Sequence, residues 1–209
     1  MIDHPIFLES IQFIRKELGS IPLEPLPKYV LERMIHTSGD FAIKDLLRFS
    51  PNAFELGLDA LKSGAGIIAD TSMASVAIKP MAKRTINAHV HNVLDWAPKQ
   101  TPECSTRTGI GMKNIWKSLG PDSQSSIAPL VVIGSSPTAL EILLDLVEKG
   151  NEPPSLIIGM PVGFIGVEKS KRLLITQTNV PFISLEGTRG GAALAASVVN
   201  ALLRESINN

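Results

Sequence analysis

The sequence predicts an α/β fold: a doubly wound, mainly parallel sheet with helices on both faces, preceded by an N-terminal helical segment. Three observations point to it. Short, continuously apolar runs recur along the chain, helical patterns lie between most of them, and the runs lack the polar alternation of a half-exposed sheet. With 209 residues, 44% of them hydrophobic, the chain can bury one sizeable core. We therefore expect a single domain over residues 1–209.

The N-terminal part of the chain is expected to be helical. Apolar residues at helical spacing predict a helix over residues 6–18, and Gly19 ends it. Because each proline removes a donor and restricts its predecessor, residues 22–27 are expected to be an extended connector. Residues 28–36 are then predicted to be helical. Another helix is expected over residues 50–61, with a serine cap and a proline in its first turn.

The remainder of the chain alternates between strands and helices. Helices are predicted after the third strand, over residues 135–149, and at the end of the chain, over residues 192–203. Ligands of doubly wound sheets bind where the strands end, so the residues after each strand are the candidates for chemistry. The predicted strands are residues 66–69, 86–90, 130–134, 156–159 and 180–184.

Composition and missing motifs exclude several functions. Twenty Lys plus Arg balance twenty Asp plus Glu, so the basic excess of a nucleic-acid or anionic-membrane binder is absent. A single cysteine, Cys104, excludes an internal disulfide and fits a reducing, cytoplasmic location. We expect no signal peptide and no membrane-spanning segment, and the sequence shows neither a glycine-rich nucleotide motif nor a serine-hydrolase elbow. We therefore expect neither a nucleotide cofactor nor a bound metal.

Two loops and one helix start carry groups that suit an anionic ligand. Residues 135–138 combine serine, proline and threonine at a helix start, which can receive an anion or simply cap the helix. Arg189 stands before two glycines, and packing of the small-residue helix that follows does not explain the arginine. Arg107 lies at a helix start that Ser105 or Thr106 can cap. It either faces solvent or offers a second carboxylate site.

The histidines offer a candidate acid. His36 ends an apolar turn and precedes residues 37–40, whose hydroxyls and carboxylate could orient an imidazole, although the local pattern by itself favours a structural histidine. His89 and His91 are two residues apart and could share a metal ion. Since no third ligand accompanies them, a polar lining or surface position is favoured.

Several segments are together similar to the precorrin-8X methylmutase family. The resemblance runs from about residue 5 to about residue 203, and the Gly-Met-Pro-Val-Gly-Phe stretch within it is specific to that family. The segments are residues 33–36, 137–140, 158–171, 188–191 and 200–202.

The resemblance implies an isomerase of vitamin B12 biosynthesis that moves a methyl group from C11 to C12 of precorrin-8X or cobalt-precorrin-8 without an external donor. It also implies a homodimer with a shared cleft, and it assigns His36 as the acid that promotes migration. A histidine suits this role because an imidazole exchanges protons near neutral pH. The residues implied to contact the polycarboxylate substrate are Ser10, Arg15, Asp70, Arg107, Ser136, Thr138, Gly163, Arg189 and Gly190.

The chain departs from the family pattern at three segments. Ile68-Ala69-Asp70 before Met73-Ala74 stand where Leu-Cys-Asp before Met-Val is common. Ser135-Ser136 stand where an Asn-Ala pair is usual, and Thr188 replaces the first of two arginines, so substrate affinity could differ. A non-catalytic corrinoid carrier is the alternative function. A nucleotide or sugar-phosphate enzyme is a third, resting on fold alone. Whether the substrate carries cobalt stays open.

Overall fold

The computed structural model describes residues 4–100, 103, 105–120, 127–176 and 179–208. Cys104 and the first three residues, to which the expectations on disulfides and a leader refer, lie outside the described residues. The elements in chain order are α1 (Pro5–Leu18), α2 (Pro25–Ser38), α3 (Ile43–Leu46), β1 (Leu47–Phe49), α4 (Ala53–Lys62), β2 (Ile67–Ala69), α5 (Ser72–Arg84), β3 (Val90–Asn92), the 3₁₀ turn η1 (Val93–Trp96), α6 (Arg107–Leu119), β4 (Leu130–Ile133), α7 (Pro137–Glu148), β5 (Leu156–Gly159), α8 (Val167–Thr176), β6 (Phe182–Leu185) and α9 (Ala192–Glu205).

The described residues form one six-stranded sheet in the order β1-β6-β5-β4-β2-β3. All neighbouring strands are parallel except β1, which runs antiparallel to β6 with Leu47 opposite Leu185. The expectation of a mainly parallel, doubly wound sheet is confirmed. Chain order reverses on either side of β2, which lies between β3 and β4, so the topological switch point lies between β2 and β4.

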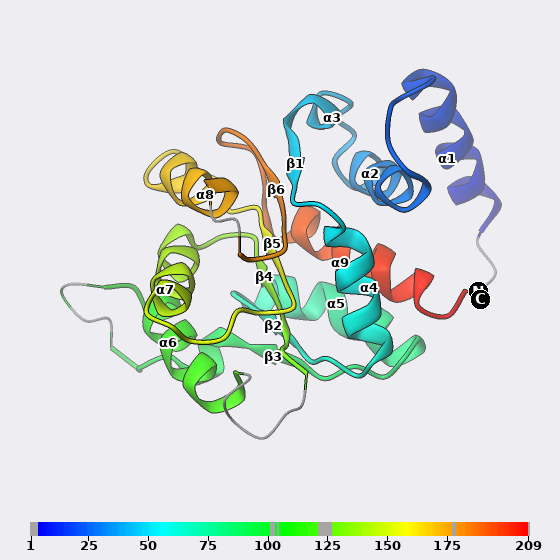
Figure 1. Cartoon of the computed structure of the whole chain (residues 1–209). Helices are drawn as coiled ribbons and strands as arrows, with labels where there is room; N and C mark the ends of the chain where they lie inside the picture. Colours follow the sequence, from blue (N-terminus) through cyan, green and yellow to red (C-terminus); the bar gives the residue numbers. More distant parts are fainter. Residues whose placement is uncertain (1–3, 101–102, 104, 121–126, 177–178, 209) are drawn as a thin grey trace.

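Helices cover both faces of this sheet (Figure 1). α2, α4, α5 and α9 pack together on one face, with α1 against α2, while α6, α7 and α8 pack on the other. The strand side chains alternate between two hydrophobic clusters. Val132 and Ile158, for example, join the α9 side, whereas Val131 and Ile157 join the α7 side. Strands buried on both faces explain why the sequence shows continuous apolar runs instead of alternation.

Three predicted boundaries were wrong. α2 begins at Pro25, inside the supposed connector, because the first helical turn needs no backbone donors and tolerates proline. α4 begins at Ala53, and Ser50 instead accepts a hydrogen bond from the Phe182 backbone. The strand expected over residues 86–90 is β3, which starts at Val90, because the preceding residues turn back onto the end of α5.

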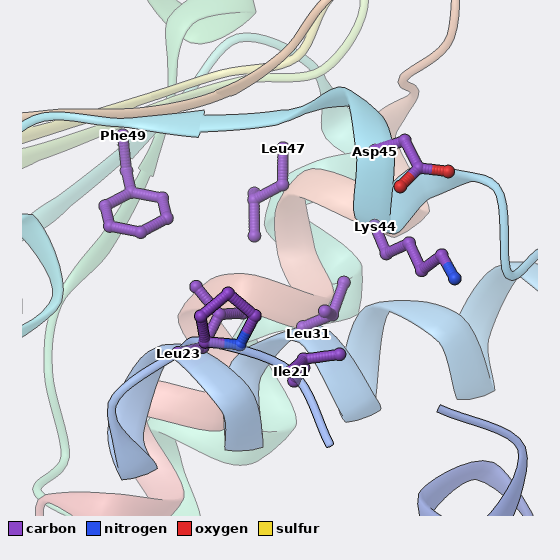
Figure 2. Close-up of a pocket in the computed structure, with 8 residues that line it drawn as sticks. Ile21, Leu23, Leu31, Lys44, Asp45, Leu47 and Phe49 are labelled. Atoms are coloured by element: carbon purple, nitrogen blue, oxygen red, sulfur yellow. The ribbon is translucent and has the colours of Figure 1, made fainter. Parts of the chain in front are cut away.

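A largely apolar cavity of about 270 Å³ lies at the β1 edge of the sheet, and none of the predicted site residues lines it. Figure 2 shows its lining, which comes from α2, β1 and the segments that precede them. No helix in the described part of the chain is long and apolar enough to cross a membrane.

Candidate functional site

His36 lies exposed in the last turn of α2, and a neighbouring helix orients its ring. The Oγ of Ser10, on α1, lies 2.8 Å from Nδ1 of His36. The Phe7 ring meets the imidazole edge to face at 5.0 Å, and the Arg33 guanidinium lies 4.5 Å from the centre of the Phe7 ring. The α1–α2 pair thus restrains the ring orientation of the histidine.

The contact with Ser10 suits a histidine that gains and loses a proton. A hydroxyl can donate to a neutral Nδ1 and can accept from a protonated one, so Ser10 partners either state. Within the described residues, Nε2 of His36 makes no hydrogen bond. Proton exchange with a ligand would therefore use Nε2.

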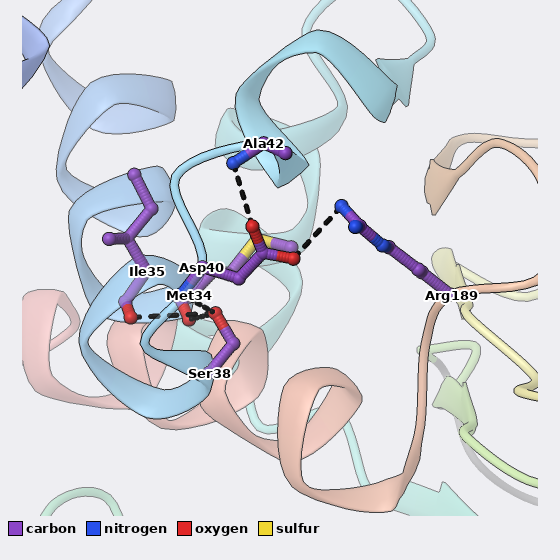
Figure 3. Close-up of polar contacts among 6 residues, drawn as sticks. All are labelled: Met34, Ile35, Ser38, Asp40, Ala42 and Arg189. Carbon is purple, nitrogen blue, oxygen red and sulfur yellow. Dashed lines mark hydrogen bonds and ion pairs between the residues drawn. The ribbon is translucent and has the colours of Figure 1, made fainter.

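The residues that follow His36 do not orient it, contrary to the expectation from sequence. The hydroxyls of Thr37 and Ser38 donate to carbonyls of their own helix. Asp40 accepts from the Ala42 backbone N–H at 2.9 Å and pairs with Arg189 at 2.9 Å (Figure 3). The acidic residue therefore ties the end of α2 to the loop between β6 and α9.

This loop packs closely against the loop that follows β5. The Gly191 N–H donates to the Met160 carbonyl at 2.9 Å, and the Gly163 N–H donates to the Thr188 carbonyl at 3.1 Å. A Cβ on Gly190 would collide with the Met160 carbonyl oxygen. Glycine is thus required at residue 190 because two backbones meet there.

Asp70 occupies the switch point of the sheet. It follows β2, is fully buried, and its Oδ2 accepts from the backbone N–H groups of Ser135 at 2.7 Å and Ser136 at 2.9 Å. Its Oδ1 has no hydrogen-bond partner within the described residues. Burial raises the pKa of Asp70, and the backbone hydrogen bonds offset only part of that effect. The carboxylate therefore joins the ends of β2 and β4.

Four hydroxyls gather next to Asp70, at the starts of α6 and α7. Ser136 caps α7 and Thr106 caps α6, as the sequence predicted. Thr108 lies 2.7 Å from the Ser136 hydroxyl, and Thr138 lies 2.5 Å from the Thr106 hydroxyl. The cluster places two helix N-termini, which favour anions, side by side.

Two predicted arginines have partners elsewhere. The guanidinium of Arg15 forms a 2.9 Å ion pair with Glu32, a buried carboxylate of α2. That hydrogen bond raises the pKa of Arg15 above its ordinary value. The Nε of Arg107 donates to the Pro98 carbonyl at 3.0 Å. Neither contact involves His36, Asp70 or Arg189.

The histidine pair at β3 has stacked rings whose centroids are 6.4 Å apart. Burial lowers the pKa of His91, and the positive neighbours His89 and Lys79 lower it further. Within the described residues, no group of three or more His, Cys, Asp or Glu side chains could hold a metal ion.

Sequence reasoning missed Lys171, a buried lysine of α8. A signal was available: Val167, Lys171 and Leu174 lie at helical spacing, and all three are buried. The role of Asp40 as the partner of Arg189 was also missed, because the two residues are distant in the chain.

Comparison with known proteins identifies the family. The family model for precorrin-8X methylmutase matches residues 5–205. The chain is 34% identical to the cobalt-precorrin-8 methylmutase of Synechocystis sp., over 97% of this chain and 95% of the relative. It is 37% identical to the precorrin-8X methylmutase of Pseudomonas aeruginosa, over 96% and 94% respectively.

A solved structure agrees with this result. The precorrin-8X methylmutase of Thermus thermophilus superposes with a TM-score of 0.84 at 33% identity, covering 97% of this chain and 98% of that one. The fold, the sequence relatives and the family model all match methylmutases of precorrin-8X or cobalt-precorrin-8. The chain therefore belongs to the precorrin-8X methylmutase family, isomerases of cobalamin biosynthesis.

Proposed function

We propose that this chain moves the methyl group of precorrin-8X or cobalt-precorrin-8 from C11 to C12 by an acid-promoted 1,5-sigmatropic shift. The C11–CH3 bond breaks as the C12–CH3 bond forms. A proton is delivered to the ring system and later returned, so nothing is consumed. His36 delivers that proton through Nε2. The Ser10–His36 contact carries this proposal, because it orients an exposed imidazole while leaving Nε2 for the ligand.

The carboxylates of the macrocycle would meet the positive groups around this edge of the sheet. Arg189 offers a planar guanidinium on the loop next to the end of α2. Arg107 stands at the start of α6, where the hydroxyls of Ser136 and Thr138 lie close by. Binding several carboxylates at separate points would fix the ring relative to His36, which is how positioning accelerates an intramolecular reaction.

We also propose that the chain is a homodimer whose subunits share the cleft. Three apolar side chains of the loop after β5 are exposed: Val162 by 49%, Phe164 by 87% and Ile165 by 90%. Val162 and Phe164 flank Gly163, whose N–H donates to the Thr188 carbonyl of the Arg189 loop. Met73 and Val76 on α5 are also exposed, by 68% and 65%. A contiguous apolar loop of this kind is typical of a surface that another molecule covers.

The reaction is tested by mixing the purified protein with metal-free and with cobalt-containing precorrin-8 and following the ring spectrum. We expect rearrangement by the wild type and by the control variant His89→Ala, which changes another exposed histidine. His36→Ala should bind the macrocycle without rearranging it. If the wild type binds the macrocycle stoichiometrically without converting it, the isomerase function is contradicted and a non-catalytic corrinoid carrier is favoured.

The shared cleft has its own test. Sedimentation should give a dimer for the wild type and a monomer for Phe164→Ser/Ile165→Asp. Two impaired variants are then mixed at a low substrate concentration: His36→Ala, which should not rearrange the substrate, and Arg189→Ala, which should bind it weakly. If each site draws these residues from different subunits, mixed dimers contain one intact site and regain activity. No recovery in dimers shown to exchange subunits would place both residues of one site on the same chain.

A further inference from the structure

Lys171 is a buried amine outside every residue set proposed above. Its exposed fraction is 1%, although it lies on a helix with many charged residues. The Nζ donates to the carbonyl oxygen of Gly187 at 2.9 Å and to that of Arg189. No carboxylate pairs with it among the ion pairs of the described residues. The recorded hydrogen bonds of the ammonium therefore all go to backbone carbonyls of one loop.

Those two carbonyls flank Thr188 in the loop between β6 and α9. The same loop also forms backbone hydrogen bonds with the segment after β5, from Gly163 to Thr188 and from Gly191 to Met160. Lys171 therefore adds two hydrogen bonds to a loop whose backbone is already tied to a neighbouring segment. From this fixed backbone the Arg189 side chain reaches Asp40, 2.9 Å away at the end of α2.

Burying the charged amine of Lys171 costs desolvation free energy, which an apolar side chain at this position would not lose. Desolvation lowers the pKa of Lys171 to about 8, and Glu168 raises it only in part. An apolar residue at the same position, between Val167 and Leu174, would complete the buried face of α8 without that cost. It would also leave the carbonyls of Gly187 and Arg189 without their donor.

We propose that Lys171 is a positioning residue: it clamps the loop of residues 187–191 so that Arg189 is presented to a carboxylate of the substrate beside the end of α2. This inference rests on the proposed function, since it assigns Arg189 to the macrocycle. Lys171 itself touches no substrate. Its effect is transmitted through the two carbonyls that bracket Thr188.

The kinetic test compares Lys171→Met with Lys171→Arg, and Lys169→Met is the matched control because it removes an exposed lysine of the same helix. Lys171→Met should raise KM about tenfold with kcat nearly unchanged, because buried carbonyls lose their donor. Lys171→Arg should recover most of this loss, and Lys169→Met should match the wild type. In an Arg189→Gln background, Lys171→Met should have little further effect. An unchanged KM, or full additivity with Arg189→Gln, would overturn the proposal.

The pH dependence of KM supplies a second test, which does not depend on whether Lys171→Met folds. Between pH 7 and about 9.5 the amine loses its charge, and its hydrogen bonds weaken. KM should therefore rise about threefold over that range in the wild type and stay flat in Arg189→Gln. Glu168 and Arg172 on α8, and Glu186 after β6, line a cavity of about 250 Å³ together with Lys171. Arg189→Gln keeps all three groups, so an effect of theirs that does not act through Arg189 would appear in both KM profiles. A flat wild-type profile would contradict the clamp.

Hydrogen exchange separates this proposal from the proposed function. The amides of Gly163 and Gly191 report the loop without any substrate. They should exchange faster in Lys171→Met, while amides in β4 and β5 keep wild-type protection. If the wild type fails to rearrange precorrin-8 but these two amides exchange faster in Lys171→Met, the proposed reaction is wrong and the role of Lys171 in holding the loop is supported. If they do not respond, the clamp is wrong whatever the reaction.

Discussion

Ser10 of α1 and His36 of α2 meet through a 2.8 Å contact between Oγ and Nδ1, although 26 residues separate them in the chain. The contact makes the serine a partner of the imidazole. The resemblance to the family gives the same hydroxyl a substrate contact, and kinetics separate the two roles.

Ser10→Ala should lower kcat about fivefold and leave KM nearly unchanged, because a net hydrogen bond of about 1 kcal/mol that orients His36 is lost. Steady-state kinetics with precorrin-8 measure this. Ser105→Ala, a serine change outside the α1–α2 pair, serves as the control. A rise in KM at constant kcat would show instead that Ser10 acts by binding the substrate.

Arg15→Met should reduce the free energy of unfolding by about 2 kcal/mol, because it leaves the carboxylate of Glu32 buried without its partner. The cost is below that of a fully buried pair, since the arginine side chain is 55% exposed. Urea denaturation measures it. Lys149→Met, which breaks an exposed pair with Asp145, should cost about 0.3 kcal/mol. A raised KM at unchanged stability would favour a substrate contact for Arg15.

Asp70→Asn should change how stability depends on pH. The pKa of Asp70 is raised in the fold, so in mildly acid solution the folded chain binds this proton more readily than the unfolded chain does. Protonation therefore stabilises the wild type, but not the asparagine variant, as the pH falls from 7 toward 4. Over that range the free energy of unfolding of the wild type should increase relative to that of Asp70→Asn.

Denaturation of both proteins at several pH values measures this difference. Because asparagine has the same shape and keeps an oxygen for the Ser135 and Ser136 N–H groups, other titrating groups cancel in the comparison. If the difference in unfolding free energy stays constant, or if the variant gains stability relative to the wild type as the pH falls, the raised pKa of Asp70 is contradicted.

Gly190→Ala should lower the unfolding free energy by about 3 kcal/mol and weaken substrate binding, because its Cβ would press against the backbone at Met160 and displace the Arg189 loop. Gly187→Ala is the matched control in the same loop. Its φ of +72° carries strain, but its Cβ meets nothing within 4 Å, so about 1 kcal/mol is expected. Thermal unfolding and KM measure both. Equal effects of the two substitutions would contradict the steric explanation.

Local pattern was sufficient for the main features of the fold. The apolar runs at β2, β4, β5 and β6 predicted parallel strands, because strands covered on both faces have no polar side to show. It was not sufficient for β1. That strand has three residues with Arg48 in the middle, and only its pairing with β6 makes it a strand. The prolines of residues 22–27 also led to a wrong prediction. α2 begins at Pro25, because proline is tolerated in the first turn of a helix.

The candidate site divides in the same way. His36, Arg189 and the caps Thr106 and Ser136 were recognisable as residue types in particular patterns, because caps and motifs are encoded over a few neighbouring residues.

The partners of these groups were decided only by the tertiary structure. It gave His36 its contact with Ser10, paired Arg189 with Asp40 and directed Lys171 to the carbonyls of a loop. Each of these contacts joins elements distant in the chain. The sequence alone determined which chemistry was present and which elements carried it. The packing of α1 on α2, and of α8 beside β6, determined which groups meet, since hydrogen bonds and ion pairs depend on distances that no local pattern specifies.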